Sequence, residues 1–146
     1  MAIDLIEHQA GGFAAANMTA VEARFHANME LLRRDSPQKV DLRIHKQRSI
    51  QALASLIAAG ASGSFDFIYV DGSHQSTDVI ADAVLAFELV RSGGVIGFDD
   101  YSWREGVASD VIRCPKLAID AFVTIFHYRV VPLPGVPLYQ FYVQKL

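Results

Sequence analysis

Apolar residues recur along the chain with two spacings, which predict helices alternating with strands. Val21, Phe25, Met29 and Leu32 lie three and four positions apart, the period of one helix face. Other apolar residues alternate with polar ones or form short unbroken runs, as strands do. The predicted order is a helix over 19–35, a strand over 40–44, a helix over 50–59, a strand over 67–70, a helix over 78–91, a strand over 95–98, a helix over 114–126, and two strands within 128–133 and 138–146.

This alternation predicts an α/β fold with a mainly parallel sheet. The last two strands are close in sequence and are joined by a Pro-Gly-containing turn, so we expect them to be antiparallel. A length of 146 residues suits one domain. We expect an irregular N-terminal segment over 1–16 and a single α/β domain over 17–146.

Composition excludes several classes of function. With 51% hydrophobic residues, the chain can form a sizeable hydrophobic core. Its net charge of −3 gives no cluster of basic residues that would bind nucleic acid. The single cysteine, Cys114, has no internal partner, which favours a cytoplasmic protein. The sequence shows no apolar run long enough to span a bilayer, so we expect no membrane segment.

Acidic residues follow two of the predicted strands. Asp71 comes directly after Val70, and Asp99 and Asp100 follow Phe98. The carboxyl ends of parallel strands meet at one edge of a sheet, where ligands bind in α/β folds. Three converging carboxylates repel one another unless a cation lies between them, and oxygen ligands suit Mg²⁺, Ca²⁺ or Mn²⁺. The alternative is that these acids cap helices or form Asx turns; we favour the cap for Asp78 and the metal site for the others.

Further polar and aromatic residues lie near these acids in sequence. His74 is either a general base or a loop histidine bonded to a carboxylate, and the sequence does not decide between the two. Tyr101 and Trp103 either wall a pocket or simply pack. Ser49 is either the cap of the 50–59 helix or part of the same edge as the acids.

Three stretches, FDFIYVDGSH, DVIADAVLAFELVRSGGVIGFDDYSW and PKLAIDAF, resemble a known family. They are similar to the C-terminal two-thirds of class I S-adenosylmethionine-dependent methyltransferases, especially small-molecule O-methyltransferases with D-G-S-H after strand four. The resemblance implies a Rossmann-like sheet of order 3-2-1-4-5-7-6 with an antiparallel last strand. Residues 40–44, 67–70 and 95–98 would be strands three, four and five, followed by six and seven.

The resemblance also implies roles for individual residues. Asp71, Asp99 and Asp100 would hold a divalent cation that binds the oxygens of a small-molecule hydroxyl acceptor. His74 would take the hydroxyl proton, with Asp71 beside it as a second catalytic residue. Asp4, Ser49 and Asp71 would contact S-adenosylmethionine, Asp4 through the ribose.

The chain departs from the family pattern at its N-terminal end. The family places a glycine-rich turn after strand one, whereas Gly11 and Gly12 follow no predicted strand. The sequence therefore resembles a methyltransferase sheet without its first strand and most of its second, and we expect very weak or no binding of S-adenosylmethionine. Three interpretations follow: a methyltransferase in truncated form, a non-catalytic remnant that binds metal or a partner, and, ranked last, an unrelated hydrolase or lyase using Asp71, His74 and Asp99.

An absent first strand would leave an edge of the 67–70 strand without its neighbour. Unpaired edges recruit other strands, so either the 40–44 strand pairs there or a second copy does. The first is slightly favoured because it needs no partner. Apolar helix residues, including Phe25 and Met29, would still be partly uncovered, and we expect a homodimer or aggregation.

Overall fold

A computed structural model gives the fold of residues 18–104 and 111–146. The described residues form two units, one ending at Ile44 and one beginning at His45. The first unit contains α1 (Met18–Asp35), which confirms the predicted first helix. Its residues Phe25 and Met29 are partly exposed, as expected.

The segment Val40–Ile44 is not a strand, so this prediction was wrong. Alternation of apolar and polar residues shows which faces a strand would have, but a strand forms only where a neighbour supplies hydrogen bonds. Among the described residues, no strand pairs with this segment. The sheet of the second unit is formed by four strands that do not include 40–44.

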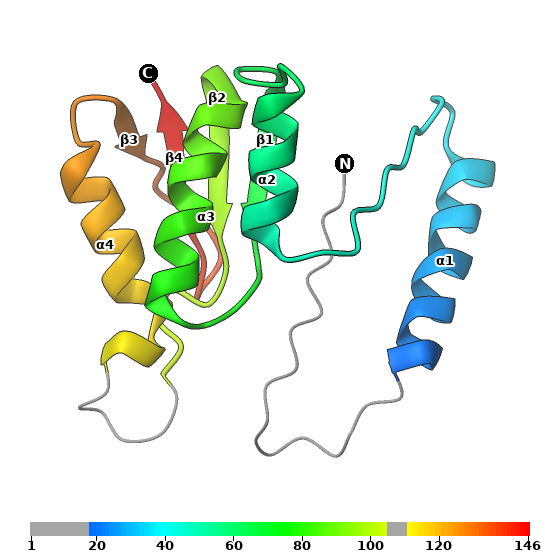
Figure 1. Ribbon diagram of the computed structural model, residues 1–146, viewed down its shortest axis with the longest axis horizontal. Coiled ribbons are helices and arrows are strands. Elements are labelled where there is room, and N and C mark those ends of the chain that lie inside the picture. Colours follow the sequence, from blue (N-terminus) through cyan, green and yellow to red (C-terminus); the bar gives the residue numbers. More distant parts are fainter. Residues whose placement is uncertain (1–17, 105–110) are drawn as a thin grey trace. The chain divides into compact units, whose positions relative to one another are not determined.

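The second unit has an α/β architecture built on a four-stranded sheet. Its elements are α2 (Ser49–Ala58), β1 (Phe65–Val70), α3 (Ser76–Leu89), β2 (Val90–Phe98), a short 3₁₀ helix (Val111–Arg113), α4 (Pro115–Ile125), β3 (Val130–Pro132) and β4 (Phe141–Lys145). The strand order is β1-β2-β4-β3, and α2, α3 and α4 lie on one face of the sheet (Figure 1).

The pairing of the strands bears out most of the predicted topology. β1 and β2 are parallel, and β4 is antiparallel to both of its neighbours, β2 and β3. The order agrees with positions 4-5-7-6 of the methyltransferase sheet, and the α/β class is confirmed. Because residues 40–44 form no strand, β1–β2 is the one parallel pair in the described part of the chain, and β1 lies at the edge of the sheet.

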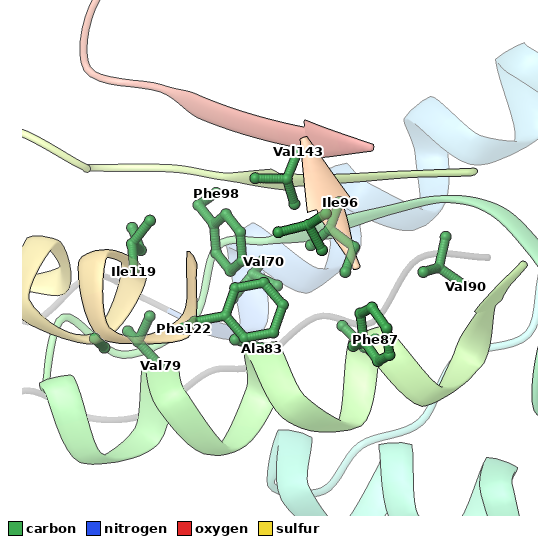
Figure 2. Packing of buried hydrophobic residues seen from close by; sticks show 13 residues of the cluster. Val70, Val79, Ala83, Phe87, Val90, Ile96, Phe98, Ile119, Phe122 and Val143 are labelled. Carbon is green, nitrogen blue, oxygen red and sulfur yellow. The ribbon is translucent and has the colours of Figure 1, made fainter. Parts of the chain in front are cut away.

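The core lies between the sheet and the helices α3 and α4 (Figure 2). Alternate residues of the strands point into it, including Ile96, Phe98 and Val143, all at most 1% exposed. From α4, the ring of Phe122 lies 5.9 Å from the ring of Phe98 on β2, and the ring of Phe87 on α3 lies 6.3 Å from that of Phe122, centroid to centroid. Each such side chain contributes roughly 1.5–3 kcal/mol by leaving water, so this cluster holds β1 and β2 in register beneath the helices.

The opposite face of the sheet carries an aromatic group from β1 and β4. Phe67, Tyr69 and Tyr142 have ring centroids 6.2–6.3 Å apart. Gly97 of β2 lies between them, and a Cβ there would come within 2.8 Å of the Tyr69 ring and 2.9 Å of the Tyr142 ring. Only glycine allows the rings this approach, two residues before Asp99.

Two helix ends show how side chains and local conformation stop the helices. Gly60 has φ +81°, and the amides of Gly60 and Ala61 donate to Ile57 and Leu56, which is a Schellman ending of α2. At the end of α3, the Lys145 ammonium donates to the carbonyls of Phe87 at 2.7 Å and Val90 at 2.9 Å. No helix within 18–104 or 111–146 has the length and apolar character that crossing a membrane requires.

Candidate functional site

The structure brings together the three carboxylates that follow β1 and β2. Ligand atoms of Asp71, Asp99 and Asp100 all lie within 4.8 Å of one another. The Asp99 amide donates to the Val70 carbonyl at 3.0 Å, which extends the β1–β2 ladder one step beyond the strands. Asp71 is exposed, and the other two are half-buried. The convergence expected from the sequence is therefore present, and metal binding remains a prediction.

The donor set fits a hard divalent cation. Oxygen ligands lie about 2.0–2.6 Å from Mg²⁺ or Ca²⁺, so two ligands of one ion are separated by at most about 5 Å. The separation of 4.8 Å or less among the three acids falls within that limit. Since all three donors are carboxylates, the site suits Mg²⁺, Mn²⁺ or Ca²⁺ rather than zinc or copper.

Asp100 sits in a turn that directs its side chain to His74. Its φ of +53° lies in the left-handed region, which aspartate adopts more readily than most residues. The Trp103 amide donates to the Asp100 carbonyl at 2.9 Å and closes the turn. Nε2 of His74 lies 2.7 Å from Oδ2 of Asp100. A carboxylate has two oxygens, so this bond is compatible with ligation of a cation by Oδ1.

His74 lies beside the acids in the position that a proton acceptor would need. Its side chain is 25% exposed and lines the same shallow pocket as Asp71. The Trp103 ring stacks on the imidazole with centroids 4.0 Å apart. In the tautomer whose Nε2–H donates to Asp100, Nδ1 is the ring nitrogen that can accept a proton. This geometry agrees with a base, but the role itself stays a prediction.

Tyr69 reaches the acids from the aromatic face of the sheet. Burial raises the pKa of its hydroxyl, and a hydrogen bond to Asp99 and the charge of that carboxylate raise the pKa further. The phenol therefore remains protonated at neutral pH and acts as a donor toward Asp99.

The expected cofactor residues have different outcomes. Asp4 lies outside the described residues. Ser49 is the first residue of α2, whose N-cap is Arg48, so the helix-cap interpretation of Ser49 was wrong. Its side chain lines a pocket with Thr77 and Asp82, among others, and that pocket shares Ser73 with the pocket of Asp71.

The cap predicted for Asp78 was also wrong. α3 begins at Ser76, its N-cap is Gln75, and Asp78 lies in its first turn. There the carboxylate suits the positive end of the helix dipole and forms an ion pair with Arg48 at 3.5 Å. Asp78 therefore supports the start of α3 without capping it.

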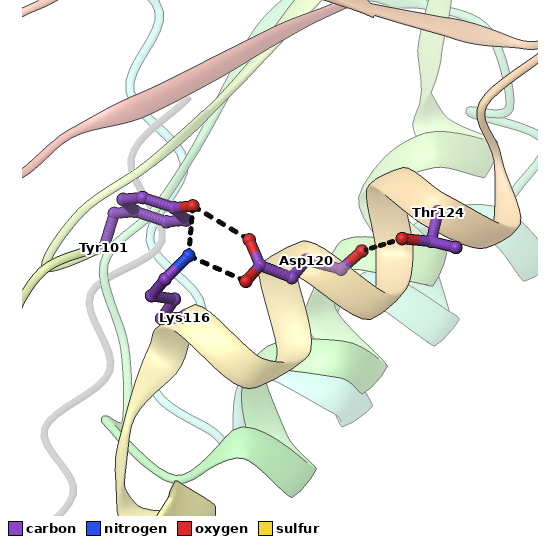
Figure 3. Close-up of polar contacts among 4 residues, drawn as sticks. All are labelled: Tyr101, Lys116, Asp120 and Thr124. Carbon is purple, nitrogen blue, oxygen red and sulfur yellow. Dashed lines mark hydrogen bonds and ion pairs between the residues drawn. The ribbon is translucent and has the colours of Figure 1, made fainter.

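The sequence did not predict that two residues of α4 lie near the acids. Lys116 and Asp120 on α4 both bond the hydroxyl of Tyr101, which follows Asp100 directly (Figure 3). In the sequence they are only an ordinary pair four residues apart on a helix face. Their hydrogen bonds to Tyr101 depend on the tertiary fold, and no local sequence pattern predicts these bonds.

Comparison with known proteins identifies what the chain is similar to. The profile of a family described as "Methyltransferase domain" matches residues 2–101. Among curated proteins, a probable caffeoyl-CoA O-methyltransferase 3 of Dictyostelium discoideum is 44% identical over 48 residues, which cover 33% of this chain and 18% of that protein. A catechol O-methyltransferase domain-containing protein 1 of Mus musculus is 37% identical over 67 residues, 46% of this chain and 24% of that protein.

A solved structure supports the fold. The MycE methyltransferase of the mycinamycin biosynthetic pathway, in complex with Mg, SAH and mycinamycin VI, superposes with a TM-score of 0.53 at 20% identity. The match covers 76% of this chain and 34% of MycE. At this identity the likeness shows a shared Rossmann-like fold. The chain spans about a fifth to a quarter of the length of the curated relatives above.

Proposed function

The chain belongs to the methyltransferase-domain family, and from that premise we propose that it takes part in S-adenosylmethionine-dependent methylation of a small-molecule hydroxyl, assisted by a divalent cation. One observation carries the proposal: Asp71, Asp99 and Asp100 converge within 4.8 Å at the carboxyl ends of two parallel strands. His74 shares their pocket. The O-methyltransferase relatives favour oxygen as the accepting atom.

Each residue of the site has a task in this chemistry. Asp71, Asp99 and Asp100 would hold the cation, which when bound would supply Lewis-acid chemistry that lowers the pKa of a substrate hydroxyl. Nδ1 of His74 takes the hydroxyl proton, and Asp100 holds the imidazole and stabilises its charged form through Nε2. Trp103 fixes the plane of the imidazole by stacking.

The methyl donor would lie next to the acids, along the pocket that contains Ser49. That pocket and the acid pocket meet at Ser73, so a ligand in one lies beside a ligand in the other. Ser49 and Asp71 are the described residues that we assign to the donor, and Asp4 is a third candidate. A cytoplasmic location is part of the proposal, supported by the single cysteine.

The test is a methyl-transfer assay with radiolabelled S-adenosylmethionine at millimolar concentration and catechol-type acceptors, with Mg²⁺ or with EDTA. The millimolar concentration offsets very weak binding of the donor, and turnover that EDTA abolishes would support the proposal. His74→Gln should lower the rate by about 10²–10⁴-fold, the range typical of a lost general base. His127→Gln is the matched control, since His127 is exposed and bonds the Thr124 carbonyl of α4.

The outcomes separate the parts of the proposal. Turnover that EDTA leaves unchanged would refute cation assistance, and an unaffected His74→Gln would refute the base. A second interpretation rests on the missing glycine-rich turn, namely a non-catalytic remnant that binds metal or a partner. Cation binding without any methyl transfer would favour that remnant.

A further inference from the structure

The acid segment Asp99–Trp103 is held by contacts with four separate parts of the second unit. Asp99 bonds β1 through the Val70 carbonyl at 3.0 Å, and Asp100 bonds His74 at 2.7 Å. The Tyr101 amide donates to the Tyr139 carbonyl, in the β3–β4 connection, at 2.7 Å. The contact with the fourth part, α4, is made by the Tyr101 side chain. Each end of the turn at Asp100 is therefore fixed independently.

The Tyr101 hydroxyl is engaged on both sides by a lysine–carboxylate pair (Figure 3). It donates to Oδ1 of Asp120 at 2.8 Å and accepts from Nζ of Lys116 at 2.5 Å. Lys116 and Asp120 are themselves 2.7 Å apart. All three polar groups therefore bond one another in a closed set, and a closed set restricts the tyrosine more than a single bond would.

The ring of Tyr101 is held as firmly as its hydroxyl. It stacks on Phe141 with centroids 4.8 Å apart, and the Lys116 ammonium lies 4.3 Å from the ring centroid. Phe141 is the β4 partner of Phe98, the last residue of β2. The tyrosine thus links the end of the sheet to α4, directly beside the acids.

We propose that Tyr101 is a positioning residue: Lys116 and Asp120 hold its side chain on α4 and thereby fix the turn that presents Asp99 and Asp100. The proposal rests on the proposed function in one respect, that the acids bind a cation. An exposed lysine–aspartate pair contributes little to stability by itself, typically below about 1 kcal/mol. If the pair positions Tyr101, its loss should weaken cation binding by the acids even where it changes the stability of the fold little.

The variants are Tyr101→Phe, which keeps the ring and removes the hydroxyl, and Asp120→Asn, which keeps the shape and removes the charge. The matched control is Asp66→Asn, because Asp66 forms an exposed ion pair with Arg91 at the same distance of 2.7 Å and lies outside the acid cluster. Asp120→Glu is the rescue variant, since it restores the charge on the same helix position.

The first measurement is Mn²⁺ binding by electron paramagnetic resonance in the 146-residue chain. Loss of groups that orient metal ligands typically weakens binding about 10–100-fold, and we expect the lower end, about tenfold, for Tyr101→Phe and Asp120→Asn. Asp120→Glu should recover most of the affinity, and Asp66→Asn should bind as the parent does. If both test variants bind Mn²⁺ as tightly as the parent, the inference is overturned.

The second measurement needs no metal. Trp103 is the only tryptophan in the sequence; it closes the turn at Asp100 and stacks on His74, which lies between β1 and α3. A loosened turn should raise the quenching of its fluorescence by acrylamide in Tyr101→Phe and Asp120→Asn but not in Asp66→Asn. If the parent chain binds no Mn²⁺, the cation proposal fails and this measurement alone decides the inference. Unchanged quenching in both test variants would overturn it.

Discussion

Replacing Asp99 with asparagine should have opposite effects on stability with and without a cation. Asparagine keeps the size and an accepting oxygen, so the bond from Tyr69 can remain. The change removes one charge from three carboxylates whose ligand atoms lie within 4.8 Å. At that separation, two unit charges repel by about 0.9 kcal/mol in water and about 3.5 kcal/mol at an effective dielectric constant of ~20.

The exposure of the acids decides between these limits. Asp71 is exposed and Asp99 is half-buried, and His74 offsets part of the charge on Asp100, so we expect a value near the lower limit. Asp99→Asn should therefore stabilise the metal-free protein by about 1 kcal/mol, which corresponds to a rise in Tm of about 3 °C for a chain of this size. Strong salt should shrink the gain by screening.

With a cation present the order should reverse. A ligand at 100 times its dissociation constant stabilises the folded state by about 2.7 kcal/mol, and only the parent chain would retain the full ligand set. Thermal melting in EDTA and in graded Mg²⁺ would show the two curves crossing. A variant less stable than the parent in EDTA, or one with the same Mg²⁺ response, would refute this reasoning. Asp66→Asn serves as the control, because its carboxylate is 81% exposed and outside the cluster.

Three more predictions concern the fold, the cofactor and the assembly. Lys145→Met should lower the free energy of unfolding in urea by about 2 kcal/mol, because the carbonyls of Phe87, in α3, and of Val90, which follows α3, lose a charged donor. Lys39→Met changes an exposed site and should alter the free energy of unfolding little, and equal effects of the two substitutions would contradict the assignment. Calorimetric titration of the 146-residue chain with S-adenosylmethionine should show very weak or no binding, since the sequence shows no glycine-rich turn, and micromolar affinity would disprove this. Sedimentation should show concentration-dependent association into a homodimer, since β1 has an open edge in the described sheet; a stable monomer over a wide concentration range would count against it.

The sequence predicted the elements of the second unit because local patterns determine them. Val79, Ala83 and Phe87 recur at helical spacing, and all three are buried on α3. The acids could be expected to converge because parallel neighbours end at the same edge of a sheet. The same kind of pattern failed for Val40–Ile44, because alternation carries no information about whether a partner strand is present.

Tertiary contacts account for what the sequence could not show. α3 begins at Ser76, two residues before the predicted start, and the Ser76 hydroxyl donates to the Cys114 carbonyl at 2.7 Å. That partner is 38 residues away. The link from Tyr101 to Lys116 and Asp120 likewise joins residues 15 and 19 positions apart. Such contacts follow from packing, and no spacing rule encodes them.

The bond from the Asp99 amide to the Val70 carbonyl has a consequence for protein design. Neighbouring strands lie about 4.7–4.9 Å apart, and this bond carries that spacing one step past the ends of β1 and β2. The interval between neighbouring strands is thus close to the greatest separation that two oxygen ligands of one cation allow. Placing an acid immediately after each of two adjacent parallel strands therefore brings two carboxylates to a separation at which both can bind one cation, without a dedicated loop. Two such acids could be introduced by substitution at the ends of adjacent strands in other parallel sheets, with the rest of the fold unchanged.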